Sequence, residues 1–356
     1  MTSSDSSPVA FVRAAVDAEL ARFVAERRAQ LLEIGGELAP VVDALEAMLA
    51  GGKRLRPAFC YWGWRGAGGA DTPDIHAAAA SLEFLQACAL VHDDVIDNSD
   101  TRRGMPATHK RMEELHARSG WSGAADGFGR GAAILIGDLC LAWSEDMYQA
   151  SGLGLEALRA GRRPFDAMRT EVMAGQYLDM LEQVREDGGV EAALRVMHYK
   201  AAKYTVERPL HLGAALAGRY DDLGPVYSAY GLPLGLAFQL RDDILGVFGD
   251  PGQTGKPAGD DLREGKRTLL VAETLDRAAP ADAAEFRRHL GDPALTPERV
   301  EWMRALVEDC GALAACERRI DDLVGQATAA LNTDLIDDTA RAPLADLIVA
   351  ATARKH

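Results

Sequence analysis

The chain has 356 residues, of which 48% are hydrophobic and 6% aromatic, and its formal net charge is −15 at neutral pH. Alanine and leucine dominate and β-branched residues rarely cluster, which favours helix over sheet, so we expect an all-α protein. An acidic body repels nucleic acid and anionic membrane surfaces, and no concentrated basic patch compensates, so neither is an expected partner. Any phosphate-bearing substrate must therefore be met by local basic residues or by metal ions.

The cysteines and the apolar segments indicate where such a protein works. The five cysteines are scattered without CxxC spacing, so neither a disulfide scaffold nor a zinc site is indicated. The segment Met1 to Ala15 lacks a basic region followed by an apolar stretch, and the longest apolar run, 132–143, is interrupted by Asp138 and too short to span a bilayer. These features predict a cytoplasmic protein without stable membrane insertion.

The chain begins with a polar segment, residues 1–8, which we expect to be disordered. Apolar residues at helical spacing follow over Phe11 to Leu32. No shift in composition marks a seam between domains, so one large domain over residues 9–350 is expected, followed by a tail, 351–356.

Further helices are predicted in chain order. Thr72, followed by a proline and an acid, is typical of a helix start, and that helix can run unbroken to about Asp97. The glycine-rich stretch 118–131 predicts a mobile loop between helices. Residues 231–246 predict a buried helix despite their glycines, and beyond Pro280 the pattern is that of amphipathic helices.

The helix that starts after Thr72 ends in a cluster of carboxylates. Asp93 and Asp97 lie one turn apart on one face, with Asp94 beside them. Like charges so close need an outside cation, and hard oxygen ligands select Mg²⁺. Arg102 and Arg103 follow at once, and guanidinium groups bind phosphate oxygens bidentately, so the pattern indicates a diphosphate substrate.

A plainer interpretation is an acidic helix end that is salt-bridged to a neighbouring loop. Acid at a helix C-terminus opposes the macrodipole, which weakens this interpretation. The pattern also repeats, because Asp242 and Asp243 end a second apolar helix and are followed by Lys256, Lys266 and Arg267. The repetition favours a metal-binding function.

Two basic segments complete the pattern. GGKRLRP places Lys53, Arg54 and Arg56 behind two glycines, which is either a solvated basic turn or a second anion site. YKAAKYTVERP places Lys200 and Lys203 three residues apart, near one helix face that is either solvated or directed at an anion. In so acidic a chain, both segments are candidate phosphate sites.

The ordered set GGKRLRP, DDVIDNSDTRRG and FQLRDDILGVFGDPGQTGKPAGDD resembles the trans-isoprenyl diphosphate synthases, the polyprenyl synthetase family that contains farnesyl and geranylgeranyl diphosphate synthases. The resemblance covers about Leu49 to Arg267. It implies the isoprenoid synthase fold, a single-domain bundle of antiparallel helices around a deep apolar cavity, and a homodimer. It also implies a prenyltransferase of isoprenoid biosynthesis that condenses isopentenyl diphosphate with an allylic diphosphate, with three Mg²⁺ ions when substrate is bound.

The resemblance also assigns roles to residues of this chain. The metal ligands that it implies are Asp93 and Asp97, with Asp94 alongside, and Asp242, with Asp243 beside it. The residues that it implies for isopentenyl diphosphate are Lys53, Arg56, Gln86 and Arg103. Those that it implies for the allylic diphosphate are Arg102, Lys200, Gln239 and Lys256. Departure of the diphosphate would depend most on Lys200, Lys256, Asp93 and Asp242.

This chain departs from the family pattern at two positions. Gly246 stands where a third aspartate usually ends the second motif, so that position cannot bind metal. Ala201 stands where many relatives carry threonine, which removes one hydroxyl from the allylic site. We expect the first departure to have a small effect, and the nearby Thr205 is a candidate substitute at the second.

The product length is predicted from the residues before the first motif. One helical turn is about 5.4 Å, close to one isoprene unit, so residues one turn apart above Asp93 can act as a ruler. Cys88 and Ala89 are small, and Phe84 lies one turn deeper as a candidate floor. This predicts geranylgeranyl diphosphate (C20), with farnesyl or longer products as alternatives, while the competing interpretation makes Phe84 ordinary core packing.

Two other functions compete. A terpene cyclase also uses a DDxxD motif, but its usual second motif, N-D-x-x-S-x-x-x-E, is absent after Asp97, and it needs no isopentenyl diphosphate pocket. A non-catalytic synthase subunit would be expected to have lost metal ligands, and both sets persist. The synthase is therefore the preferred hypothesis.

Overall fold

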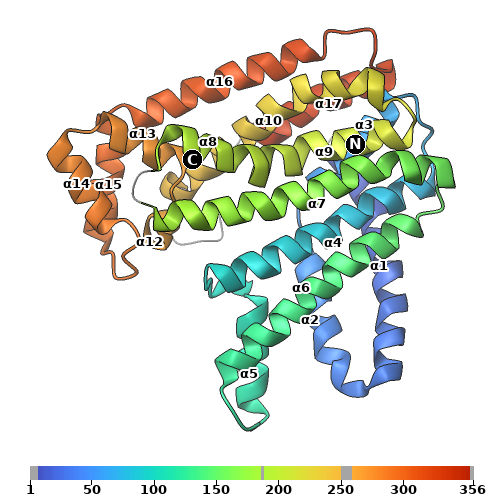
Figure 1. Ribbon diagram of the computed structural model, residues 1–356, viewed down its shortest axis with the longest axis horizontal. Helices are drawn as coiled ribbons and strands as arrows, with labels where there is room; N and C mark the ends of the chain where they lie inside the picture. The colour runs from blue at the N-terminus through green and yellow to red at the C-terminus, as the bar shows by residue number, and fades with distance from the viewer. Residues whose placement is uncertain (1–6, 186–187, 250–258, 353–356) are drawn as a thin grey trace, which may run out of the picture. The chain divides into compact units, whose positions relative to one another are not determined.

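The computed structural model describes residues 7–185, 188–249 and 259–352, and it consists almost entirely of helices (Figure 1). In these ranges the extended structure is one antiparallel ribbon, formed by β1 (Thr101–Arg102) and β2 (Met105–Pro106). The prediction of an all-α protein is confirmed.

The chain divides into two compact units that interleave along the sequence, and each is described by itself. The first comprises Met1–Phe165, Pro209–Tyr220 and Asp337–Pro343. The second comprises Asp166–Arg208, Asp221–Ile336 and Leu344–His356. The single domain expected over residues 9–350 stays a prediction.

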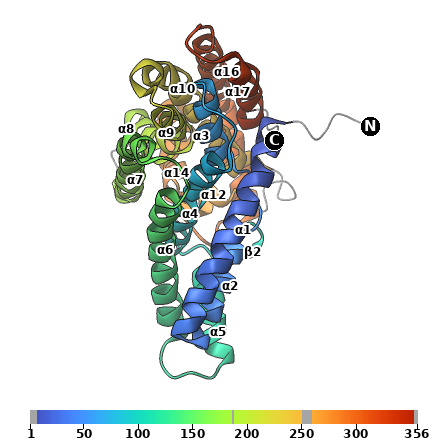
Figure 2. The same cartoon turned by 90° about the vertical axis from the view of Figure 1, so that its right-hand side faces the viewer.

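The first unit is built around α4. Its helices in chain order are α1 (Pro8–Ile34), the 3₁₀ helix η1 (Gly36–Leu38), α2 (Ala39–Leu49), α3 (Leu55–Gly66), α4 (Pro73–Ile96), α5 (Thr108–Arg118), α6 (Ala125–Gln149), the start of α7 (Leu155–Val184), most of α9 (Arg208–Leu216) and the start of α17 (Asp338–Thr352). Helices α1, α4 and α6 run alongside one another (Figure 2). Among the described residues, α4 alone is long and apolar enough to cross a membrane, and 78% of that apolar window is buried inside the structure. Core helices of folded proteins pass the same test. Helix α4 contacts α1, α2, α3, α5 and α6, so it is the centre of this unit's packing.

Two boundaries in the first unit differ from prediction. Helix α1 begins at Pro8, with the Ser7 hydroxyl accepting a hydrogen bond from the Ala10 N–H, so residues 7 and 8 are ordered, whereas they were expected to be disordered. The rest of that segment, 1–6, lies outside the described residues. The loop between helices that was predicted over 118–131 is present but shorter, because α5 ends at Arg118 and α6 already starts at Ala125. A Cβ at Gly129 would overlap the His109 carbonyl, so this glycine serves the close packing of α6 on α5 rather than a mobile loop.

The second unit contains the rest of α7 and α17 together with α8 (Val190–Val196), the π-helix η2 (Met197–Glu207), α10 (Tyr220–Phe248), α12 (Asp260–Glu264), α13 (Leu269–Arg277), α14 (Pro280–His289), α15 (Pro297–Asp309) and α16 (Ala312–Ala330). Its apolar core includes Leu240, Ile244, Val247 and Leu262, all with no exposed surface. The buried helix expected over residues 231–246 is thus confirmed as part of the longer α10.

Glycines bring α7 and α10 against the π-helix η2. A Cβ at Gly175 on α7 would meet the backbone of Lys200, and one at Gly235 on α10 would meet Ala202. A side chain at Gly235 would prevent this close approach of the two helices. This explains why α10 contains glycine there, although glycine lowers the stability of a helix. They also fix η2, whose π-helical turns are of a kind often found at functional sites.

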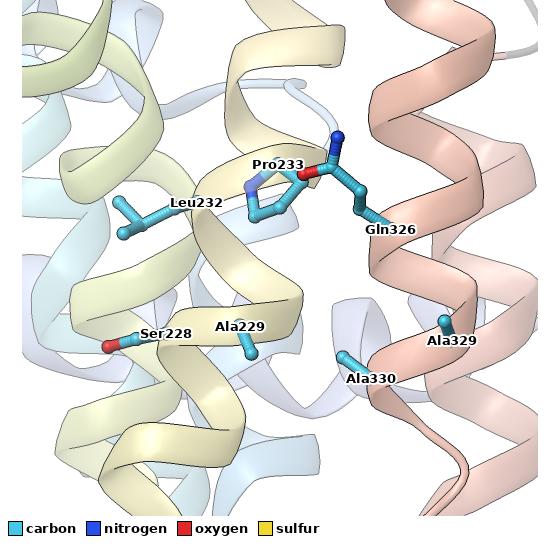
Figure 3. A pocket seen from close by; sticks show the side chains of 7 residues that line it. All are labelled: Ser228, Ala229, Leu232, Pro233, Gln326, Ala329 and Ala330. Atoms are coloured by element: carbon cyan, nitrogen blue, oxygen red, sulfur yellow. The ribbon is translucent and has the colours of Figure 1, made fainter.

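An open hollow of about 600 Å³ lies between α10 and α16 (Figure 3). It is lined by Ser228, Ala229, Leu232, Pro233, Gln326, Ala329 and Ala330. None of the residues predicted for the functional site lines it, so this hollow is not the deep cavity that the family resemblance implies.

Candidate active site

The first carboxylate set lies in the first unit, where α4 ends. Asp93 and Asp97 are half-buried and one turn apart, and the Asp97 N–H donates to the Asp93 carbonyl oxygen at 2.8 Å. Asp94 differs from both, because its side chain has no exposed surface. The three carboxylates therefore do not form one group, and only Asp93 and Asp97 share the accessible face.

Arg102 returns on strand β1 to the end of α4. Its Nε donates to Asp94 Oδ1 at 2.9 Å, its terminal Nη2 contacts the same oxygen, and Nη2 lies 3.5 Å from Asp93 Oδ2. The chain thus supplies part of the positive charge that was expected from an outside cation. Burial still raises the pKa of Asp94 despite Arg102, and its Oδ2 has no hydrogen-bond partner. This buried arrangement makes Asp94 a poor metal ligand.

The loop between α2 and α3 places its cations differently. Gly51 and Gly52 have φ of 76° and 93°, and Arg54 adopts the left-handed φ of 53° that favours glycine. Arg54 is 5% exposed and turns inward, where it donates to Glu83 Oε2 at 2.5 Å, Asp17 Oδ1 at 2.8 Å and the Leu49 carbonyl at 2.6 Å. Arg54 is therefore the loop's structural anchor and is not available to bind substrate.

Lys53 and Arg56 flank this anchor, the first exposed and the second half-buried. Arg103 joins them, because Gly52 leaves room for its guanidinium, which lies 3.4 Å from where a Cβ at Gly52 would sit. Its Nη1 donates to the Met48 carbonyl at 3.3 Å. Burial lowers the pKa of Arg103, and the charges of Arg54, Arg102 and Arg56 lower it further. Clustered guanidinium groups of this kind favour a bound anion.

Gln86 lies on the same face of α4 as Asp93, because seven residues make about two turns. Its side chain is half-buried, as are those of Asp93 and Asp97. The first unit therefore holds seven of the predicted substrate and metal residues, besides Asp94, at the end of α4, on the following ribbon or in the loop before α3, namely Lys53, Arg56, Gln86, Asp93, Asp97, Arg102 and Arg103.

The second carboxylate set belongs to the second unit. Asp242 is half-buried on α10, whereas Asp243 is 5% exposed and accepts a hydrogen bond from Gln239 Nε2 at 2.8 Å. Burial raises the pKa of Asp243 to about 8, and the charges of Asp261 and Asp242 contribute to the rise. As in the first set, the second aspartate of the pair is turned into the protein. Gln239 was predicted to hold the allylic diphosphate, but here its amide is bonded to Asp243.

The raised pKa of Asp243 predicts a pH dependence of stability. A carboxyl that is protonated when folded and ionised when unfolded stabilises the fold at low pH, and this contribution is lost as pH rises from about 4 towards about 8. We expect the thermal midpoint of the metal-free wild type to fall across this range relative to Asp243→Asn, whose amide mimics the protonated acid. Parallel midpoints for the two proteins from pH 5 to pH 8 would contradict this.

The lysines of η2 are engaged by acids of α7 within the second unit. Lys200 Nζ lies 2.6 Å from Asp179 Oδ2, and Lys203 Nζ lies 3.1 Å from Glu171 Oε1 and 3.8 Å from Glu207 Oε2. The solvated-face interpretation is thus wrong for both lysines. Asp179 was not predicted as a site residue, because it is one of several acids within the long helix α7 and only its partner Lys200 could have singled it out. Lys256 lies outside the described residues.

No complete metal site is preformed in the described parts of the chain, because no three acidic, histidine or cysteine side chains are grouped to hold an ion. Asp93 with Asp97 nevertheless offers the hard oxygen atoms that Mg²⁺ prefers. Proteins commonly bind Mg²⁺ through one or two carboxylates, with water and substrate phosphates supplying the other oxygens. The residues present therefore fit a metal ion that arrives with a diphosphate.

Comparisons with known proteins identify the family. The family model described as polyprenyl synthetase matches residues 39–307. The chain belongs to the polyprenyl synthetase family. It is accordingly a trans-prenyltransferase of isoprenoid biosynthesis, which confirms the predicted enzyme class and reaction.

Several relatives resemble this polyprenyl synthetase along most of its length. It is 32% identical over 281 residues to the geranylfarnesyl diphosphate synthase of Aeropyrum pernix, covering 78% of this chain and 81% of the relative. It is 33% identical over 306 residues to the geranylgeranyl diphosphate synthase of Mycobacterium tuberculosis, covering 86% of this chain and 80% of the relative. The crystal structure of geranylgeranyl pyrophosphate synthase from Corynebacterium glutamicum, complexed with isoprenyl diphosphate and magnesium, has 42% identity and a TM-score of 0.93, covering 98% of this chain and 99% of that one.

Proposed function

We propose that this polyprenyl synthetase condenses isopentenyl diphosphate with an allylic diphosphate to give geranylgeranyl diphosphate, with Mg²⁺ as its metal. The observation that carries the proposal is that one unit holds both the carboxylates Asp93 and Asp97 and the guanidinium cluster around Arg103. Arg102 belongs to that cluster and its Nη2 lies 3.5 Å from Asp93 Oδ2. The C20 product is supported by the geranylgeranyl diphosphate synthases among the relatives, while the geranylfarnesyl relative keeps a longer product as the alternative.

The residues divide the two substrates between them in this proposal. Lys53, Arg56, Gln86 and Arg103 bind isopentenyl diphosphate. The positive charges of the lysine and the two arginines offset the repulsion between two diphosphates, and the Gln86 amide supplies a hydrogen-bond donor. Arg102, Lys200, Gln239 and Lys256 bind the allylic diphosphate. A bound metal would neutralise the charge that develops on the leaving diphosphate.

The proposed metal ligands are Asp93, Asp97 and Asp242, for three ions when substrate is bound. Asp94 and Asp243 were predicted as ligands too, but their side chains are buried and hydrogen-bonded to Arg102 and Gln239. Their role in this proposal is to hold Arg102 and Gln239 in position. Lys200 is held by Asp179 at 2.6 Å, so its ammonium is placed in advance for the leaving diphosphate.

The test is an assay of the purified protein with Mg²⁺, isopentenyl diphosphate and labelled farnesyl diphosphate, followed by chromatography of the products. An elongated C20 diphosphate supports the proposal. A hydrocarbon would indicate a terpene cyclase, and absence of turnover would indicate a non-catalytic subunit.

The prediction about product length concerns the positions of Phe84 and Ala89 on α4. Phe84 precedes Asp93 by nine residues, about two and a half turns, so the two side chains leave α4 on opposite sides. Phe84 has no exposed surface and packs in the first unit with Phe23 and Trp143, at ring-centroid distances of 5.2 and 6.0 Å. These contacts support the competing interpretation, in which Phe84 is ordinary core packing and not the floor of the cavity.

Ala89 is the better candidate for control of length, because it lies one turn before Asp93 on the same side of α4. We expect Ala89→Phe to shorten the main product to C15. Phe84→Ala should leave product length unchanged and lower stability by about 3–5 kcal/mol, through the cavity it creates. Product chromatography and denaturant unfolding of both variants check this, and a longer product from Phe84→Ala would restore the floor hypothesis.

A homodimer in the cytoplasm completes the proposal. Helix α6 carries two large apolar side chains with high exposure, Ile134 at 46% and Leu135 at 65%, next to each other. Burial of such residues against a second copy is a common way to cover an apolar surface.

A further inference from the structure

The second motif has a gap at Gly246, which lies one turn beyond Asp242 on α10, as Asp97 lies one turn beyond Asp93 on α4. Gly246 is within a regular helix and has no left-handed φ, so its backbone does not require glycine. The space around it does. A Cβ at this position would overlap the carboxylate of Asp261, with Oδ2 as the nearest atom. A carboxylate from another element therefore occupies the place of the missing side chain.

The position of Asp261 is fixed by the short helix α12 that carries it. Gly259 and Gly265 bound this helix, both with left-handed φ, of 73° and 75°. Leu262 is fully buried in the same apolar core as Ile244 and Val247 of α10, and its carbonyl accepts a hydrogen bond from the Gly291 N–H at 2.9 Å. The contact of Asp261 with Gly246 is thus set by core packing.

The two oxygens of Asp261 have different surroundings. Oδ1 lies 3.6 Å from Lys266 Nζ, which is closer, at 2.7 Å, to Glu264 Oε2. Oδ2 is directed at the surface of α10 beside Gly246. Position 246 lies one turn beyond Asp242, so Oδ2 of Asp261 lies on the face of α10 that carries Asp242. Lys266 can therefore balance the charge of Asp261 while Oδ2 remains directed at the motif.

We propose that Asp261 supplies, from α12, the carboxylate that the second motif lacks at Gly246, so that Asp242 and Asp261 together hold a divalent metal ion. This inference rests on the proposed function, because it concerns the same metal. The remaining oxygens come from substrate diphosphate and water, in keeping with how Mg²⁺ is usually bound. Glycine at position 246 is then a requirement of the site, since any side chain there displaces Oδ2.

The test measures metal binding without catalysis. The probe is Mg²⁺ titrated in the presence of inorganic pyrophosphate, and the readout is the rise in thermal midpoint with Mg²⁺ concentration. Asp261→Ala removes the carboxylate, whereas Gly246→Ala keeps every carboxylate and only displaces Oδ2. We expect both variants to need about 10-fold or more Mg²⁺ for half the wild-type rise, the range found when groups that orient metal ligands are lost.

The double variant G246D/D261A moves the carboxylate onto α10 and should recover most of the wild-type Mg²⁺ response. Asp260→Asn is the matched control, because it makes the same change of charge on the same short helix and should behave as wild type. The midpoint of each variant without metal reports folding. If Gly246→Ala is destabilised without metal, the Mg²⁺ response of Asp261→Ala tests the role of Asp261, because this variant adds no volume.

The outcomes separate this inference from the proposed function. A wild type that shows neither Mg²⁺-dependent stabilisation nor prenyl transfer overturns the proposed function. A wild type that shows both, with Asp261→Ala and Gly246→Ala responding to Mg²⁺ as it does, overturns the role of Asp261 alone.

Discussion

Replacing Asp93 or Asp97 with asparagine is expected to lower kcat/KM for prenyl transfer by about 100-fold or more, the usual loss when one electrostatic group at a developing charge is removed. Both side chains are half-buried on the accessible face at the end of α4, one turn apart. Asparagine keeps their size and removes their charge, so the loss reports metal binding and not packing. Steady-state kinetics at saturating Mg²⁺ measures the effect.

Asp100→Asn provides the control for these variants. Asp100 lies shortly after the same motif with a side chain that is 80% exposed, and its ion pair with Lys110 spans 3.5 Å. Exposed pairs of this kind contribute little, so kcat/KM should stay within about twofold of wild type. Activities of Asp93→Asn and Asp97→Asn equal to that of Asp100→Asn would remove the first motif from the mechanism.

Arg54→Ala is expected to destabilise the protein by about 3–5 kcal/mol, because it leaves the buried Glu83 carboxylate without its cation. Arg54 and Glu83 are 5% and 6% exposed, and their ion pair spans 2.5 Å. Denaturant unfolding measures the change. Glu83→Gln should be destabilising as well, since it breaks the same pair from the other side.

Arg56→Ala is the comparison for Arg54→Ala, two residues further along the chain. Its side chain is half-buried, so we expect little change in unfolding and a KM for isopentenyl diphosphate that rises by about 10-fold or more, the cost of one lost charge-assisted hydrogen bond. Equal unfolding midpoints for Arg54→Ala and Arg56→Ala would contradict the anchor role of Arg54.

Local pattern was sufficient to predict the bounds of α4. Proline after Thr72 and the apolar run that follows predicted α4 from start to end, because capping and periodicity are local properties. The loop predicted over 118–131 was too long at its C-terminal end, since glycine promotes loops in isolation but here Gly129 allows α6 to pack against α5. Contacts between helices decide such positions, and one sequence does not show them.

The residue types of the site could be predicted, but their orientations could not. Two adjacent aspartates have equal standing in a sequence, yet the helix turns Asp93 outward and Asp94 into the core, where Arg102 meets it. In the same way, the left-handed backbone at Arg54 turns that side chain inward, away from the site. The contact of Asp261 with Gly246 joins residues fifteen positions apart through core packing, so no local spacing rule predicts it.

The most direct test of the central claim is chromatography of the products formed from isopentenyl diphosphate and labelled farnesyl diphosphate, with Mg²⁺ and after its removal by a chelator. We predict a C20 diphosphate as the main product with Mg²⁺ and no elongation once Mg²⁺ is removed. Recovery of only the unchanged primer in the presence of Mg²⁺, or elongation that persists with the chelator, would contradict the proposal of a metal-dependent geranylgeranyl diphosphate synthase.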